Sequence, residues 1–231
     1  MLNFKSETER FLSVIYPERC IACDCYLTDS NETDKVLLAH YFCNSCSKEV
    51  SWLEERIEDR YAFDKIAIPL EYSGAVREAI LRLKFNSDLS SSQFFSREVE
   101  RAIRTNFYGV KFDIFTCVPS TKKSVATRGY NQSQLIAEKV RIDAEYDFSL
   151  LRKKKTTEIQ HLLSAEERKK NIESAYSMSP GRNVVDKTIL LIDDIFTTGA
   201  TCNACARELK FAGASAVYVV CVAKRRWKEI D

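Results

Sequence analysis

Two adjacent carboxylates follow a short apolar run in the C-terminal part of the chain, at Asp193 and Asp194 after TILLI (188–192). In an open parallel sheet, ligands bind beyond the carboxyl ends of the strands. The turn FTTGAT then leads into a predicted helix, whose first N–H groups lack partners and carry partial positive charge. Gly199 lets the backbone approach a bound group closely. Hydroxyl donors come from Thr197, Thr198 and Thr201.

This combination predicts an anion site for a sugar phosphate. The turn is suited to a monophosphate at a helix N-terminus, although the chain has no G-x-x-x-x-G-K-[ST] sequence. Two carboxylates beside a phosphate would repel an all-anionic ligand, whereas sugar hydroxyls can donate to them. A ribose 5-phosphate meets this demand. The alternative is an Asp-Asp turn followed by a threonine N-cap.

A second polar turn follows the predicted strand FDIFTCVP, which Pro119 ends. Such a turn would form another anion site facing the first across the sheet edge. Its binding candidates are Ser120 and Thr121, and its cationic candidates are Lys122, Lys123 and Arg128. The alternative for the cations is a mobile basic surface loop, and for Asn131 the N-cap of the next helix.

Four cysteines form two C-x-x-C pairs separated by nineteen residues. They are Cys20, Cys23, Cys43 and Cys46. This spacing is typical of a closed four-thiolate zinc site, which is structural because no coordination position stays open. Unligated cysteines or an iron site are the alternatives, and the neighbouring Cys25 and His40 are predicted to be bystanders. Cys202 and Cys205 also form a C-x-x-C, but in a predicted helix, where small buried core residues are favoured over a redox pair.

Composition predicts an ordinary globular protein. The 231 residues are 45% hydrophobic, and the net charge of +2 implies no strong global attraction to nucleic acid. No apolar run approaches the ~18 residues that span a bilayer. Nine cysteines without an export signal favour a reducing cytoplasm.

The elements that must position these residues alternate between strand and helix. Strands are predicted at 63–70, 112–119, 188–192 and 216–223, with a weaker one at 145–153. Helices are predicted at 75–83, around Phe95 to Phe107, and at 131–140, 164–171 and 201–212, the fourth with a Ser164–Glu167 capping box. The pattern predicts an α/β domain, a mostly parallel sheet flanked by helices, over 61–231. Residues 1–60 would hold an amphipathic N-terminal helix and a zinc-ribbon-like module.

Four stretches carry a family resemblance. ILLIDDIFTTGAT (189–201) resembles the phosphoribosyl pyrophosphate signature of type I phosphoribosyltransferases. Residues 71–85, 118–138 and 156–176 resemble segments of ComF-like competence proteins, which also begin with a double C-x-x-C. The chain is thereby identified as a ComF family member from about residue 16 to 224.

The resemblance implies roles for the candidate residues. Asp193 and Asp194 would hold the ribose hydroxyls, and the second turn would take the pyrophosphate with Mg²⁺, its charge neutralised by Lys122 and Arg128. The 5-phosphate would be held by Thr197, Thr198, Gly199, Ala200 and Thr201. The family implies a cytoplasmic factor that handles imported single-stranded DNA during natural transformation, and basic runs at 152–155, 168–170 and 224–226 support DNA contact. The alternatives are an active phosphoribosyltransferase with an unidentified acceptor and a binding-only sensor of phosphoribosyl pyrophosphate.

Overall fold

The structure is a computed structural model that describes residues 18–27, 36–53, 61–85, 89–154 and 175–225. The predicted N-terminal helix and the Ser164–Glu167 capping box lie outside these ranges. Contacts divide the chain into one unit of residues 1–51 with 73–91 and another of 52–72 with 92–231. The helix at 74–85 therefore groups with the cysteine-rich segment, while the proposed boundary at residue 60 stays a prediction.

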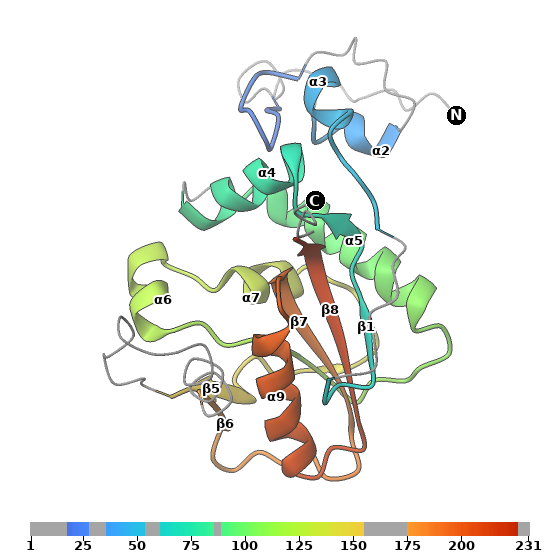
Figure 1. Cartoon of the computed structure of the whole chain (residues 1–231). Helices are drawn as coiled ribbons and strands as arrows, with labels where there is room; N and C mark the ends of the chain where they lie inside the picture. Colours follow the sequence, from blue (N-terminus) through green and yellow to red (C-terminus); the bar gives the residue numbers. More distant parts are fainter. Residues whose placement is uncertain (1–17, 28–35, 54–60, 86–88, 155–174, 226–231) are drawn as a thin grey trace, which may run out of the picture. The chain divides into compact units, whose positions relative to one another are not determined.

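A parallel sheet forms the larger unit (Figure 1), with strand order β1-β8-β7-β3-β4 and β2 also paired to β8. The strands are β1 (Lys65–Ala67), β2 (Leu70–Glu71), β3 (Ile114–Cys117), β4 (Glu145–Tyr146), β7 (Thr188–Phe196) and β8 (Ala216–Lys224). Every pair in this sheet is parallel. The predicted mostly parallel sheet flanked by helices is confirmed.

The larger unit contains the helices α5 (Ser91–Asn106), α6 (Lys122–Arg128), α7 (Gln132–Ala137) and α9 (Ala200–Phe211). Side chains of the long strands alternate between the two faces of the sheet. Val217, Val219 and Cys221 of β8 share one buried cluster with residues of α9. Tyr218 faces the other side, where its ring contacts Phe107. A separate antiparallel pair, β5 (Leu151–Lys153) and β6 (Tyr176–Met178), adds to the α9 side.

Strand β7 is longer than its predicted five residues and contains both acids. On one side it pairs with β8 as far as Phe196↔Lys224, whereas on the other β3 stops at Cys117↔Ile192. Asp193 and Asp194 therefore lie within a strand but beyond the end of one neighbour. Backbone pairing with β8 extends the strand across two residues of low strand propensity.

The smaller unit contains α2 (Val36–Ala39), α3 (Asn44–Ser47) and α4 (Gly74–Phe85). Helix α4 buries the predicted apolar stripe of Val76, Ile80 and Leu83. Its Arg82 donates to the Asp24 carboxylate at 2.9 Å, and Arg19 donates to the other oxygen of that carboxylate at 3.1 Å. These ion pairs tie α4 to the turn that carries the first two cysteines.

Candidate functional site

The two loops singled out in the sequence leave the same edge of the sheet, at the point where the chain direction reverses. From β3 the chain passes through α6 and α7 to β4, and from β7 it passes through α9 to β8 on the opposite side. The gap between β3 and β7 is thus a topological switch point, where open parallel sheets bind ligands beyond the strand ends. The loops that follow β3 and β7 therefore leave the sheet beside each other, and their role as anion sites stays a prediction.

The two acids are not equivalent in the structure. Asp193 is 9% exposed, and its carboxylate accepts from the Ser133 hydroxyl at 3.1 Å and from the Asp194 N–H at 2.9 Å. Asp194 is half-buried, and its carboxylate accepts from the Ile195 N–H at 2.6 Å. The Asp193 carboxylate therefore links β7 to α7 by a hydrogen bond, and the Asp194 carboxylate is the more accessible of the two.

Buried thiols surround the Asp193 carboxylate. The Cys202 thiol lies 3.8 Å from one carboxylate oxygen and 3.7 Å from the Cys221 sulfur. Burial and the charge of Asp193 raise the pKa of Cys117 to about 12. Burial likewise raises the pKa values of Cys205 and Cys221 well above the ordinary thiol value. These thiols stay protonated near neutral pH, and Cys202 and Cys205 are buried core residues, as predicted.

The phosphate-loop candidates end where α9 begins. Thr197 and Thr198 are exposed, and Gly199 adopts φ 72° as the N-cap of α9 without a side-chain cap hydrogen bond. The Thr198 hydroxyl accepts from the Ala200 N–H at a long 3.4 Å. In contrast, Thr121 caps α6 by accepting from the Ser124 N–H, and Asn131 caps α7 by accepting from the Ser133 N–H. Of these three helices, α9 is the one whose N-cap residue provides no side-chain cap, which suits an anion at its first turn.

Close packing around Gly199 also leaves no room for a side chain at this position. A Cβ there would lie 2.6 Å from the Phe196 ring and 2.8 Å from the Tyr61 ring. The Tyr61 hydroxyl also donates to the Thr198 carbonyl at 3.1 Å. Sequence reasoning missed Tyr61, because nothing in the local pattern around it indicates a partner 137 positions away.

The last threonine of the loop lies beside a tyrosine of β6. The side chain of Thr201 is half-buried and interacts with the Tyr176 hydroxyl. Burial raises the pKa of Tyr176, with the nearby charge of Asp193 acting in the same direction.

The second polar turn is a helix start in the structure, which corrects the expectation of a tight turn at 120–122. Helix α6 runs from Lys122 to Arg128, capped by Thr121 and ended by Gly129 at φ 85°. None of its residues is buried, so it lacks the apolar stripe by which helices are recognised. The Thr121 hydroxyl is occupied by its capping bond.

Residues Arg128 to Ser133 connect α6 and α7 to the switch point. Asn131 donates to the Val118 carbonyl at 2.9 Å, which ties α7 to the end of β3. Arg128 donates to the side-chain carbonyl of Gln132 at 3.2 Å. Gln132 is 3% exposed, and its amide nitrogen has no hydrogen-bond partner among the described protein atoms. A buried donor of this kind calls for a water or a ligand oxygen.

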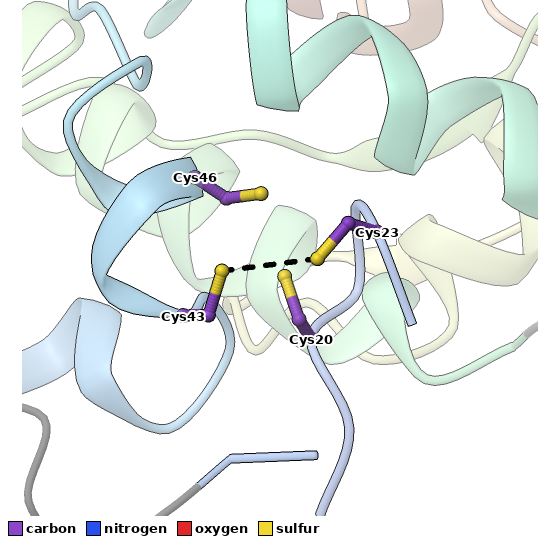
Figure 2. A group of neighbouring side chains, drawn as sticks. All are labelled: Cys20, Cys23, Cys43 and Cys46. Carbon is purple, nitrogen blue, oxygen red and sulfur yellow. Dashed lines mark hydrogen bonds between the residues drawn. The ribbon is translucent and has the colours of Figure 1, made fainter. Parts of the chain in front are cut away.

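The four N-terminal cysteines come together as the spacing predicts. Figure 2 shows the side chains of Cys20, Cys23, Cys43 and Cys46 pointing toward one another. The four sulfur atoms all lie within 4.8 Å of one another. Four thiolates about 2.3 Å from one tetrahedral ion would stand about 3.8 Å apart, and the Cys23 and Cys43 sulfurs are 3.7 Å apart. The cluster fits a metal ion such as zinc.

The ionisation of the four thiols is uneven. Burial opposes ionisation of Cys43, but the Cys46 N–H and neighbouring thiols outweigh it and lower the pKa of Cys43 to about 7. Burial raises the pKa values of Cys20 and Cys46, although backbone N–H groups act in the opposite direction on Cys20. Thiolates are the metal-binding form of cysteine, so Cys43 is the thiol most ready to bind a metal ion.

The two predicted bystanders differ in position. The Cys25 sulfur lies 3.4 Å from that of Cys23, at the border of the cluster. His40 is exposed, and its Nδ1 lies 4.0 Å from the Glu18 carboxylate.

Comparisons with known proteins find one matching domain and several similar bacterial proteins. The model of the phosphoribosyl transferase domain matches residues 123–231. The DNA utilization protein YhgH of Escherichia coli K12 is 30% identical over 172 residues, covering 70% of this chain and 73% of that protein. Competence protein F of Haemophilus influenzae is 24% identical, covering 77% and 82%. Competence protein ComFC of Bacillus subtilis is 29% identical, covering 77% and 69%.

Within the described ranges, no helix has the length and apolar character needed to cross a bilayer.

Proposed function

Because this chain belongs to the ComF family of competence-related, phosphoribosyltransferase-like proteins, we propose that it binds phosphoribosyl pyrophosphate with Mg²⁺ at the edge between β3 and β7. The observation that carries the proposal is the juxtaposition of a half-buried acid, Asp194, with the N-terminus of α9, whose N-cap residue Gly199 provides no side-chain cap. A ribose 5-phosphate presents hydroxyl donors to the first and an anion to the second.

Each candidate residue then has a distinct task. Asp194 accepts hydrogen bonds from the ribose hydroxyls, and Asp193 holds β7 against α7 through Ser133. The 5-phosphate meets the backbone N–H groups that begin α9 and the exposed hydroxyls of Thr197 and Thr198. The unpartnered amide of Gln132 offers a further donor at the switch point.

The pyrophosphate lies on the side of the exposed cations Lys122 and Lys123. Among the described residues, the cysteine cluster is the one group that could hold a metal through protein atoms alone. Mg²⁺ would therefore enter with the ligand and bridge its phosphate oxygens, which this ion prefers.

Calorimetric titration with phosphoribosyl pyrophosphate and Mg²⁺ tests the proposal. We expect binding by the natural protein and a loss of about 10- to 100-fold in affinity for Asp194→Asn, since hydrogen bonds to a charged group contribute about 1.5–3 kcal/mol. Asp143→Asn is the matched control, because this exposed carboxylate precedes β4 and so lies at the opposite sheet edge. Absence of binding by the natural protein, or equal affinity in both variants, would refute the proposal.

The second candidate function is transfer of the phosphoribosyl group, which the match to a phosphoribosyl transferase domain supports. The C1–O bond would break with its electron pair leaving on pyrophosphate, while an acceptor nucleophile forms the new bond to C1. Fixed positive charge near the leaving oxygens, from Lys122 and Arg128, would favour this step. Pyrophosphate release measured with a panel of acceptors separates transfer from binding alone.

We further propose a role with single-stranded DNA, which is supported by relatives named DNA utilization protein and competence protein. Exposed cations at Arg152, Lys154 and Arg225 support phosphate contacts. A gel shift at two salt concentrations should show binding that weakens as salt rises, and unchanged DNA binding by Asp194→Asn would show that the two sites are independent. Salt-insensitive or absent binding would contradict direct DNA contact.

We also propose that the cysteine cluster holds zinc in a structural role. Four thiolates in closed coordination suit zinc, and metal binding supplies folding free energy to small modules. Native mass spectrometry should find one zinc ion per chain, and a different metal or none would contradict this assignment.

A further inference from the structure

Tyr61 makes three kinds of contact with the loop that precedes α9. Its hydroxyl donates to the Thr198 carbonyl at 3.1 Å, and its ring closes the space beside the Gly199 Cα. The same ring stacks on Phe63 with centroids 4.8 Å apart and meets Phe196 edge-on at 5.8 Å. The tyrosine is thus held by two neighbouring rings while its hydroxyl holds the loop.

The next residue, Ala62, makes a second hydrogen bond to this region, at the first turn of α9. The Ala62 N–H donates to the Asn203 side-chain carbonyl at 2.7 Å, one turn into α9. Residues 61 and 62 therefore contact the loop and the helix that follows it, from a segment more than 130 positions away in sequence.

The hydrogen bond to the Thr198 carbonyl has a consequence on the other side of that peptide. A trans peptide is planar, with its C=O and N–H pointing in opposite directions. Anchoring the Thr198 carbonyl toward Tyr61 therefore turns the Gly199 N–H away from Tyr61. Gly199 is the N-cap of α9, so this N–H stands beside the N–H groups of the first helical turn, which have no partner within the helix.

We infer that Tyr61 is a positioning residue of the phosphate loop, which orients the Gly199 N–H toward the 5-phosphate of a ribose phosphate. This inference rests on the proposed function. Without the hydroxyl, the Thr198–Gly199 peptide can rotate, since Gly199 carries no side chain to restrict it. The anion would then lose a fixed donor, although the fold around the loop would persist.

The test is Tyr61→Phe, which removes the hydroxyl and keeps the ring that fills the space beside Gly199. We expect affinity for ribose 5-phosphate to fall about five- to tenfold, which corresponds to one hydrogen bond. Affinity for magnesium pyrophosphate should stay the same, because the other loop takes that group. Amide hydrogen exchange at residues 198–201 should become faster.

Tyr146→Phe is the control, since its hydroxyl also donates to a backbone carbonyl, that of Val140 at 2.8 Å, and in addition accepts from the Ile142 N–H at 3.1 Å. It removes at least as many hydrogen bonds outside the proposed site and should leave both affinities unchanged. If the natural protein binds ribose 5-phosphate and Tyr61→Phe binds it equally well, the inference is overturned. If the natural protein does not bind it at all, the proposed function fails instead, so the two failures are distinguishable.

Discussion

The cysteine cluster and the sheet-edge site are assembled in different ways. Each half of the cluster is a short local motif, so only one long-range approach, between Cys20–Cys23 and Cys43–Cys46, has to be made. The sheet-edge site collects groups from β3, α7, β7 and α9 and from Tyr61, which meet only through the topology of the sheet. A metal site of this kind can therefore be predicted from the spacing of its cysteines, whereas a site at the ends of strands can be recognised only once the fold is known.

The two regions should also differ in what stabilises them. The segments that carry the cysteines bury a small set of apolar side chains, among them Ile21, Leu38 and Phe42, and a metal ion would add folding free energy to this small core. The sheet unit has a continuous buried cluster between β7, β8 and α9. Loss of the metal should therefore affect the first region and spare the second.

The largest effect is expected from Cys43→Ser. Removing one of four thiolates should lower metal content to about a tenth or less and loosen residues 18–51, since structural zinc contributes on the order of 10 kcal/mol to small modules. Metal analysis and amide hydrogen exchange measure the two effects. Exchange in β7 and β8 should not change, and joint loss of protection in both regions would show that they fold as one.

Gly199→Ala should give the next largest effect, a destabilisation of about 2–4 kcal/mol. A positive φ costs about 1 kcal/mol for alanine, and the Cβ would also meet the Phe196 and Tyr61 rings at 2.6 and 2.8 Å. Gly181→Ala is the control, with φ 75° but no atom within 4 Å of the added Cβ. Denaturant unfolding of both variants isolates the packing cost, and equal destabilisation would mean that the rings simply move aside.

Much of the architecture could be predicted because it depends on local periodicity. The alternation of apolar runs and helical stripes indicated the parallel sheet and flanking helices, and apolar runs located β7 and β8. The extension of β7 through Asp193 and Asp194 could not be predicted, because it depends on pairing with β8. Helix α6 escaped recognition because none of its residues is buried.

The loops of the candidate site could be predicted from the sequence, but the residues that contact those loops could not. The acids and the threonine turn form a contiguous motif, whereas Ser133, Tyr61 and Tyr176 act through contacts that only the fold creates. The unequal burial of Asp193 and Asp194 has the same origin. Adjacent strand residues face opposite sides of a sheet, so each meets a different set of neighbours.

A smaller effect is expected from Ser133→Ala, which removes the hydroxyl donor to Asp193. Leaving a buried carboxylate with one donor fewer should cost about 1–2 kcal/mol of stability and weaken ribose phosphate binding a few-fold. Ser149→Ala is the control, since its exposed hydroxyl donates at 2.8 Å to Asp147, a carboxylate that Arg182 also neutralises. Unfolding and titration should separate the variants, and equal costs would indicate that Asp193 is hydrated despite its burial.

The smallest effect is expected from Cys25→Ser, which tests how sharply spacing defines the metal site. Its sulfur lies 3.4 Å from that of Cys23 but outside the group of four that close on one point. Metal content should stay at the natural level, because four thiolates already complete a tetrahedron. A loss of metal as large as that of Cys43→Ser would make Cys25 a ligand. Spacing alone would then have chosen the wrong thiol, and the cluster would depend on its folded surroundings as much as the sheet edge does.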